Sequence, residues 1–196
     1  AESAVGIGSM SKITVQFSEP MATSTINAST FLVASGGTSI TGSIAVSADG
    51  RIATFTPASG YSYGSTITGT ITTGVRDLAG NYLGTNKVWN FSVTSQPTVS
   101  IVATVPNPNN LASMPMTVVF SKPVTGFAVG DITVGNGTVS AFSGSGATYT
   151  CFIVPGGSGL VTVDVPANVA VDANGDGNLA AAQLSRTVDI TPPTVI

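Results

Sequence analysis

The chain has 196 residues, of which only 8% are charged, and its formal net charge is -3. It contains no His and a single Cys, which excludes a Ser-His-Asp relay, a His-based zinc site and an internal disulfide. The 6 Lys and Arg residues are scattered and form no basic patch for nucleic acid. We therefore expect no catalytic residues and no nucleic-acid partner, in one large domain or two small ones.

The apolar residues alternate with Thr and Ser instead of gathering in long runs. No run approaches the ~18 apolar residues that a spanning helix needs, although the mean hydropathy is positive. The sequence begins with neither Met nor a basic segment followed by an apolar one, as expected of a chain whose signal was removed or of an excised piece. We predict no transmembrane segment. Low charge and scarce Lys are typical of secreted bacterial surface proteins.

Apolar and polar residues that alternate in steps of two predict β-strands throughout the first half of the chain. Ala48-Asp49-Gly50 separates two of these segments and predicts the turn of a hairpin. The predicted strands are Lys12–Ser18, Thr30–Ala34, Ile40–Ser47, Arg51–Thr56, Ser65–Thr73 and Lys87–Thr94.

The second half has the same alternation and the same punctuation by Gly, Pro and Asn. A faintly helical pattern occurs at Ala180–Leu184. Short strands at regular spacing predict an all-β sandwich architecture. The predicted strands are Thr98–Thr104, Met116–Ser121, Asp131–Val134, Thr138–Phe142, Ala147–Val154, Leu160–Val165 and Ser185–Ile190.

The two halves repeat each other with a period of about 95–100 residues. This repeat predicts two sandwich domains in series, residues 1–95 and 96–191, which join near Ser95–Pro97. The matching segments are Ile13–Val33 with Met116–Val134, Ser47–Gly60 with Ser143–Gly157, and Thr72–Leu83 with Ala167–Ala180.

Several motifs resemble bacterial Ig-like domains of the kind repeated in large surface proteins and adhesins. They are FSEPM at Phe17–Met21, SADGRIATFTP, VRDLAGN, VVFSKPVTGF and VAVDANGDGN. The resemblance implies two tandem immunoglobulin-like β-sandwiches with a non-enzymatic spacer role at the cell surface. The Cys, Trp, Cys pattern of antibody domains is absent, and Trp89 is predicted in the last strand of its domain.

The ends of the chain are out of phase with the repeat. Phe120 lies 23 residues after Pro97, whereas its counterpart Phe17 has only 16 residues before it, so the first domain is predicted to lack its first strand. Residues 192–196 match the start of the second domain, since PTVI repeats PTVS. They are the start of a following module or a donor strand. The donor interpretation predicts contacts with Ala4–Ile7 or Lys12–Ser18 of a neighbouring copy, made by Pro193, Thr194, Val195 and Ile196.

One loop has the spacing of half a calcium-binding loop. Asp172, Asn174 and Asp176 place oxygen ligands at alternate positions, and Asp189 is a candidate fourth ligand. The twelfth position is Gln183, so the bidentate carboxylate of such loops is missing. The alternative is a turn stabilised by Asn, Asp and Gly alone. Calcium is the one cofactor that the sequence suggests.

The remaining candidates have structural interpretations. Cys151 alternates with apolar residues and is predicted to be a buried thiol, because no His or cation cluster can activate it. Tyr61, Tyr63 and Tyr82 form a sugar-stacking patch or, as we favour, pack in the core and loops. Lys122, which matches Glu19 of the first half, is predicted in a solvated loop.

Three functional hypotheses result. The first is a structural module in the stalk of an extracellular surface protein, with neighbouring Ig-like modules as partners. The second is the complete subunit of a surface filament, held together by copies of itself through strand donation. The third is a calcium- or carbohydrate-binding accessory module of a secreted enzyme, with contacts to cell-surface glycans.

Overall fold

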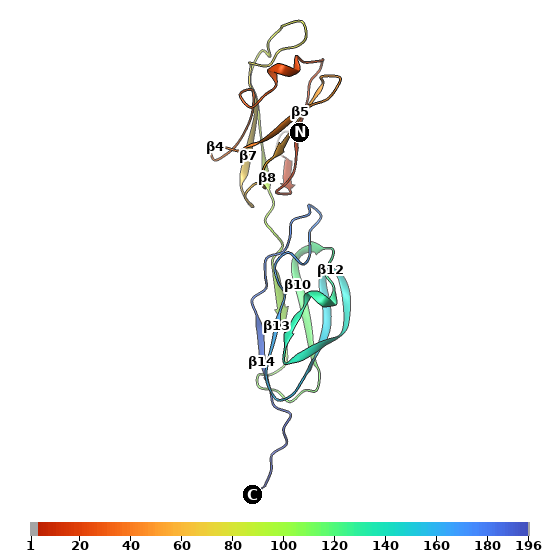
Figure 1. Ribbon diagram of the computed structural model, residues 1–196. Coiled ribbons are helices and arrows are strands. Elements are labelled where there is room, and N and C mark those ends of the chain that lie inside the picture. Colours follow the sequence, from red (N-terminus) through yellow and green to blue (C-terminus); the bar gives the residue numbers. More distant parts are fainter. Residues whose placement is uncertain (1–3, 196) are drawn as a thin grey trace. The chain divides into compact units, whose positions relative to one another are not determined.

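The structure, a computed structural model, describes residues 4–195. The chain divides into two compact units, Ala1–Ser95 and Gln96–Ile196 (Figure 1). Short 3-10 turns at Thr23–Thr25 and Val129–Asp131 are the helical elements of the described residues. No helix in that part of the chain has the length and apolar character needed to cross a membrane. The all-β prediction is confirmed.

The first unit contains β1 (Ala4–Ile7), β2 (Ile13–Gln16), β3 (Phe31–Ser35), β4 (Thr38–Ser39), β5 (Gly42–Val46), β6 (Ile52–Pro57), β7 (Thr66–Ile71) and β8 (Lys87–Val93). One sheet has the strand order β1-β8-β7-β3-β4 and the other has the order β2-β6-β5. β1 and β8 run parallel, and the other paired strands run antiparallel.

Side chains from both sheets form the core of the first unit. The alternation in β7 directs Ile67 and Ile71 inward, where both are buried. The ring of Phe31 lies 6.0 Å from that of Phe55 and 6.2 Å from that of Trp89. Burying each such side chain stabilises the fold by about 1.5–3 kcal/mol. Gly69 faces the Trp89 ring so closely that a Cβ atom there would clash with it.

The second unit contains β9 (Val99–Val102), β10 (Met114–Val124), β11 (Thr133–Gly135), β12 (Gly137–Pro155), β13 (Gly159–Asp164) and β14 (Leu184–Val188). Its sheets have the orders β12-β10-β9 and β11-β13-β14, with antiparallel pairs throughout. Its core includes an aromatic cluster in which Phe127 contacts Phe120 at 5.1 Å and Tyr149 at 4.9 Å between ring centroids.

The hairpin turn predicted between β5 and β6 is confirmed. The N–H of Gly50 donates to the carbonyl of Ser47 at 2.9 Å, and Gly50 has a φ of 69°, which glycine adopts without strain. The Asp49 carboxylate accepts a hydrogen bond from the N–H of Arg51 at 3.1 Å. These bonds fix the register of the two strands.

The strands predicted at 138–142 and 147–154 are the two arms of a hairpin that together carry the label β12. The N–H of Gly156 donates to the carbonyl of Asn136 at 3.1 Å, and the rings of Phe142 and Tyr149 stack at 5.7 Å between centroids. Gly144 and Gly146, at φ values of 131° and 65°, lie in the turn between the arms. The helical pattern at Ala180–Leu184 was wrong. The N–H of Ala181 donates instead to the carbonyl of Val165 at 2.9 Å, which holds this segment extended. The strand β1 was not predicted.

Candidate functional site

The acidic turn of the second unit has the same backbone hydrogen bonds as a turn in the first unit. The two turns span residues 75–83 and 170–178, and each bond recurs 95 positions later. The structure thus confirms the sequence match of these segments. The matching bonds are Asp77 N–H to Asn81 O (3.0 Å) with Asp172 N–H to Asp176 O (3.1 Å), and Leu83 N–H to Val75 O (3.1 Å) with Asn178 N–H to Ala170 O (3.0 Å).

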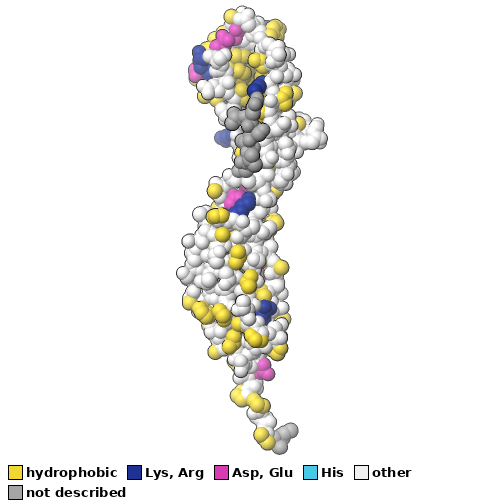
Figure 2. Space-filling model, turned by 180° about the vertical axis from the view of Figure 1, so that it is seen from behind, with side chains coloured by type: hydrophobic (Ala, Val, Ile, Leu, Met, Phe, Trp, Pro, Cys, Tyr) yellow, Lys and Arg dark blue, Asp and Glu magenta, His cyan; other side chains and the backbone are white. Residues whose placement is uncertain are grey.

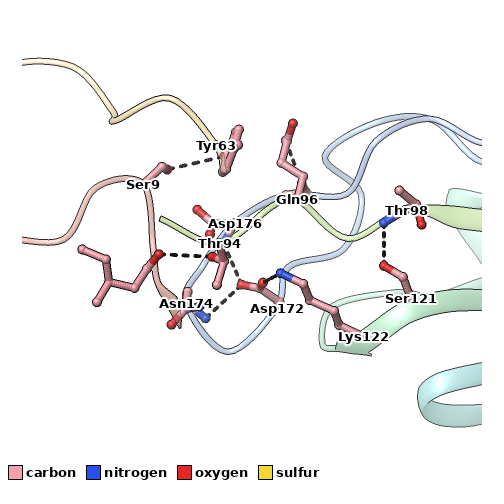
Figure 3. A network of polar contacts seen from close by, with 12 residues as sticks. Ser9, Tyr63, Thr94, Gln96, Thr98, Ser121, Lys122, Asp172, Asn174 and Asp176 are labelled. Atoms are coloured by element: carbon pink, nitrogen blue, oxygen red, sulfur yellow. Dashed lines mark hydrogen bonds and ion pairs between the residues drawn. The ribbon is translucent and has the colours of Figure 1, made fainter. Parts of the chain in front are cut away.

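The carboxylate of Asp172 accepts hydrogen bonds on both oxygens (Figure 3). Its Oδ1 accepts from the N–H groups of Asn174 at 2.9 Å and Asp176 at 3.1 Å. Its Oδ2 lies 3.1 Å from the Nζ of Lys122, which extends from β10. Burial raises the pKa of Asp172, but the hydrogen bonds from Lys122 and from the two N–H groups outweigh it and hold the pKa below its ordinary value.

The side chain of Asn178 lies inside the same turn and holds its backbone by hydrogen bonds. Its side chain is 0% exposed and its Oδ1 accepts from the N–H groups of Val169 at 3.0 Å and Ala170 at 2.9 Å. Its Nδ2 donates to the carbonyls of Pro166 and Leu179, both at 2.8 Å. All four hydrogen-bonding positions of this amide are therefore used to hold the loop. Sequence analysis named Asn178 only as part of the motif and missed this role.

The structure brings together only part of the predicted calcium ligand set. Asp172 and Asp176 are buried in one loop, and the side chain of Asn174 is exposed there. Asp189 follows β14, next to the start of β13, whereas the loop follows the end of β13. Six residues of strand, roughly 17 Å, separate these two ends. The amide of Gln183 donates to Asp164 at 2.8 Å.

Among the described residues, no group of three Asp, Glu, Cys or His side chains is placed to hold a metal ion. The hydrogen bonds of Asp172 support the interpretation of this loop as a turn. The calcium interpretation stays a prediction.

The expectation of a solvated loop at Lys122 was wrong. Lys122 lies within β10, and its side chain is 28% exposed because it reaches across to Asp172. No local pattern could have indicated this pair, since 50 residues separate its members. The scarcity of cations was the available signal, because Lys122 and Arg186 are the only ones after residue 96 in the sequence.

Cys151 is a buried core residue, as predicted. Burial raises the pKa of its thiol and so disfavours the reactive thiolate. Its neighbours in the core are apolar and aromatic side chains of the second unit. The structure therefore gives this thiol a packing role.

The three tyrosines do not form one patch. Tyr61 is buried, with its ring 5.8 Å from that of Phe91, and burial raises its pKa to about 12. Tyr63 precedes the start of β7, whereas Tyr82 lies in the loop after the end of β7. Tyr63 and Tyr82 are exposed at opposite ends of this strand. The predicted alternative of a sugar-stacking patch is thus wrong, because the loops that carry the rings lie apart.

The strand β2 has a neighbour on one side only, whereas its counterpart β10 has neighbours on both sides. In the second unit, β10 lies between β12 and β9. In the first unit, β2 pairs with β6, and no strand among residues 4–95 pairs with its other edge. That edge carries the N–H and C=O groups of Thr14 and Gln16, which have no backbone partner among residues 4–195, because Phe17 N–H points to Arg51 O on the β6 side at 2.8 Å.

The open edge changes the burial of the strand beside it. Val118 and Phe120 of β10 are 1% and 2% exposed. Their counterparts Val15 and Phe17 in the first unit are only half-buried. The pattern of apolar residues is the same in both strands, so the difference follows from the missing neighbour.

A groove opens next to this edge. It has a volume of about 150 Å³ and lies between β2 and β8. Its apolar lining comes from Ile7, Ile13, Trp89 and Phe91, and Lys12, Thr14 and Asn90 complete it. In the second unit, Val99 and Ile101 of β9 cover the corresponding side of the core.

The predicted donor segment is exposed. Thr191 is held by its N–H to Asp189 Oδ1 at 3.0 Å and by its hydroxyl, 2.9 Å from that of Ser158. Residues 192–195 beyond it form no strand, and hydrophobic side chains are spaced along this part of the chain (Figures 1 and 2). Ile196 lies outside the described residues.

Two family models, both described as bacterial Ig-like domain, match residues 1–93 and 93–190. A search of curated proteins found no match. The solved structures that the chain matches include the N-terminal part of the bacterial S-layer protein SbsC, with a TM-score of 0.40 and 21% identity. That comparison covers 96% of this chain and 43% of the SbsC chain, so the chain spans less than half of that structure.

Two further structures have lower identity. InvD of Yersinia pseudotuberculosis has a TM-score of 0.31 and 14% identity, over 98% of this chain and 58% of that chain. Domains MG0-NIE-MG1 of Escherichia coli alpha-2-macroglobulin have a TM-score of 0.41 and 10% identity, over 93% of this chain and 68% of that chain. The family matches cover residues 1–190 between them, and the chain belongs to the bacterial Ig-like domain family, with two such domains in tandem.

Proposed function

We propose that the chain is a non-enzymatic spacer module in the stalk of an extracellular bacterial surface protein. The observation that carries this proposal is the pairing of the first and last strands of the first domain. β1 runs parallel to β8, with Ala4 opposite Phe91 and Val5 opposite Ser92. Tension on the two ends of such a pair acts along the strands, so it loads all their hydrogen bonds together instead of one after another.

The second domain repeats this arrangement in shorter form. Asn109 forms a parallel bridge with Val188, the last residue of β14. The N–H of Asn109 donates to the carbonyl of Thr187 at 3.0 Å, and its carbonyl accepts from the N–H of Asp189 at 2.9 Å. The pairing of β9 with β10 adds a second ladder near the start of this domain. Both domains thus have ends suited to bear tension.

The connecting peptide is anchored closely on both sides. The N–H of Thr94 donates to Ile7 at 3.0 Å within the first domain. Within the second domain, the Gln96 side chain donates to Gly177 at 2.8 Å and Thr98 N–H donates to Ser121 at 2.9 Å. Pro97 between them has a fixed φ. A peptide with so little slack passes tension from one domain to the next without extending much itself.

The surface location is the second part of the proposal. Bacterial Ig-like domains and a surface with few charged side chains, as on the face in Figure 2, support it. The finer roles of adhesion and glycan binding have no comparable support. For glycan binding, Tyr61 is buried and the tyrosines are dispersed.

Stretching single molecules of the full chain tests the spacer role. We expect two separate unfolding events, one for each domain. The 90 residues from 4 to 93 release about 300 Å of chain when the first domain opens, at up to ~3.6 Å per residue. Extension at low force without two distinct events would contradict the proposal. Labelling of intact cells of the source organism with an antibody to the chain tests the location.

A further inference from the structure

We propose that the open edge of β2 accepts the C-terminal segment of a second copy of this chain as an added antiparallel strand. Strand addition requires an edge with unused backbone groups and a core surface that the new side chains can cover. The β2 edge has both, because Thr14 and Gln16 direct backbone groups outward and the groove beside Ile13 is apolar.

The second domain supplies a template for the added strand. There β9 pairs with β10, with Ile101 opposite Val118 and Val99 opposite Phe120. Val99 is buried, and Ile101 packs against the same core. A strand laid on β2 in this register would cover Val15 and Phe17, which are half-buried without it.

The C-terminal segment has the sequence that this template requires. Pro193-Thr194-Val195-Ile196 repeats Pro97-Thr98-Val99, and Ile196 stands in the place of Ser100. In the register of β9, Val195 lies opposite Phe17 and Ile196 lies opposite Gln16. Val195 is fully exposed, so its side chain is available for this contact. The overlap is short, and we expect weak binding that depends on concentration.

The geometry of the second domain assigns the donor to another copy. The tail leaves this domain where Asn109 meets Val188, whereas the peptide from the first domain enters where Val99 meets Phe120. Asn109 lies beside Met114, with its Nδ2 3.5 Å from the Met114 sulfur, and the six-residue step from Met114 to Phe120 along β10 covers about 20 Å. Thr191 is held at the same end as Val188 by the hydroxyl of Ser158, 2.9 Å away, and residues 192–195 beyond it span at most about 14 Å. The tail therefore cannot return to the entry point of its own domain.

A donor at one end of the chain and an acceptor strand near the other give a head-to-tail contact. Such a contact uses two different surfaces and does not close on itself unless a ring forms, so repeated addition lengthens the assembly. The proposal rests on the spacer role and adds a partner to it. A row of Ig-like domains can then continue from one molecule to the next. Each contact between molecules adds a strand to the sheet that contains β2, as β9 adds a strand beside β10 within one chain.

Disulfide trapping between two variants of the full chain tests this register. The acceptor carries Gln16→Cys and the donor carries Ile196→Cys, at positions that the proposal places opposite each other. The control acceptor carries Ser43→Cys in β5, an exposed position at the other edge of the same sheet. Cys151 is 2% exposed and does not compete for oxidation in the folded chain.

We expect several-fold more mixed dimer with Gln16→Cys than with Ser43→Cys. Adding Val195→Asp to the donor abolishes the excess, because a carboxylate cannot enter the apolar position. A donor extended by Ile-Val, the residues that follow Ser100 in β9, raises the yield further. Circular dichroism of each variant confirms that it is folded.

Equal yields from the two acceptors, or an excess that Val195→Asp leaves unchanged, would overturn the proposal. The edge would then belong to another occupant, such as a segment that precedes residue 1. The stretching experiment tests the spacer role independently of the disulfide trapping. A chain that unfolds in two events and forms no Gln16-specific dimer keeps the spacer role and loses this partner, whereas a chain that dimerises without two events loses the spacer role.

Discussion

β2 and β10 occupy the same place in the two domains, and they differ in what lies beside them. β10 has β9 on its outer side, and its apolar side chains Val118 and Phe120 are fully buried. β2 has an open outer edge, and Val15 and Phe17 are half-buried. Equivalent residues of the two strands therefore contribute differently to the stability of their domains. The reason is that the burial of these side chains depends on a neighbouring strand, which lies elsewhere in the sequence.

The two acidic turns also differ in the neighbours that their equivalent aspartates contact. The Asp77 carboxylate accepts hydrogen bonds from the N–H and the side-chain amide of Asn81, four residues later in the same turn. The Asp172 carboxylate depends in part on Lys122, from a strand 50 residues earlier. The backbone of the two turns is alike, but the second turn is tied to the body of its domain.

Truncation of the equivalent phenylalanines has the largest expected effect. Phe120→Ala leaves a cavity next to Phe127 and Tyr149 and destabilises the second domain by about 3–5 kcal/mol. Phe17→Ala removes a half-buried ring and costs the first domain about 1–2 kcal/mol. Urea denaturation can be followed separately for the two domains. The single Trp lies in β8, so its fluorescence reports the unfolding of the first domain. Far-UV circular dichroism follows both.

Equal losses from the two substitutions would break the comparison, because they would mean that Phe17 is as well covered as Phe120. Ser18→Ala in the first domain and Asn110→Ala in the second, both at exposed positions, provide the controls for each domain.

Asn178→Ala has the next largest effect. It removes four hydrogen bonds of a fully buried amide and leaves backbone groups in the turn without partners. We expect a loss of about 3 kcal/mol in the second domain. The transition seen by circular dichroism shifts, and the Trp89 fluorescence transition does not. Asn110→Ala, at an exposed position of the same domain, is the control. A shift as small as that of the control would mean that the turn holds without Asn178.

Lys122→Met has a smaller effect that depends on pH. The pKa of Asp172 is lowered in the folded state, so its charge stabilises the fold above the unfolded pKa of about 3.9. This stability is lost as the pH falls through the folded pKa. Removing Lys122 raises the folded pKa and weakens the second domain by about 1 kcal/mol at pH 7.

Urea denaturation of the wild type and of Lys122→Met from pH 7 to pH 3 measures this difference. The two curves converge as the pH falls through the folded pKa of Asp172, because protonation removes the charge that Lys122 stabilises. A constant difference at all pH values would show that Lys122 stabilises the domain by packing alone.

The smallest effect is expected from calcium. Both oxygens of Asp172 already accept hydrogen bonds, and Asp189 lies at the other end of β13. Calcium or a chelator should leave the thermal transition of the second domain unchanged. A rise in the transition temperature with calcium would establish the ligand interpretation of the loop, and Asp176→Asn would then remove the rise.

Most of the fold follows from local patterns. Alternation placed strands at Lys12–Ser18 and Arg51–Thr56, and the repeat placed the two acidic turns in register. The glycines between Phe142 and Ala147 also indicated the turn that divides β12 into two arms. β1 is missing from the predicted strands, although Ala4–Ile7 was a candidate acceptor edge, because its four residues include Gly and are too few for a clear alternation.

The site was predicted less well, because its contacts join distant segments. The motif of Asp172, Asn174 and Asp176 is visible in the sequence, but its partner Lys122 is not. The offset between Phe17 and Phe120 did indicate a difference in the strands before them. Sequence could not specify that the open edge belongs to β2 or that a groove lies beside Ile13, since both depend on how the sheets pack.

Hydrogen exchange of the matched amides of Gln16 and Val119 tests the central claim most directly. In β10 the N–H of Val119 faces β9, whereas in β2 the N–H of Gln16 faces the open edge. In dilute solution we predict that the Gln16 amide exchanges at least ~100-fold faster than the Val119 amide, and that its protection rises with protein concentration. Equal protection in dilute solution would mean that β2 already has a second neighbour and would contradict the account.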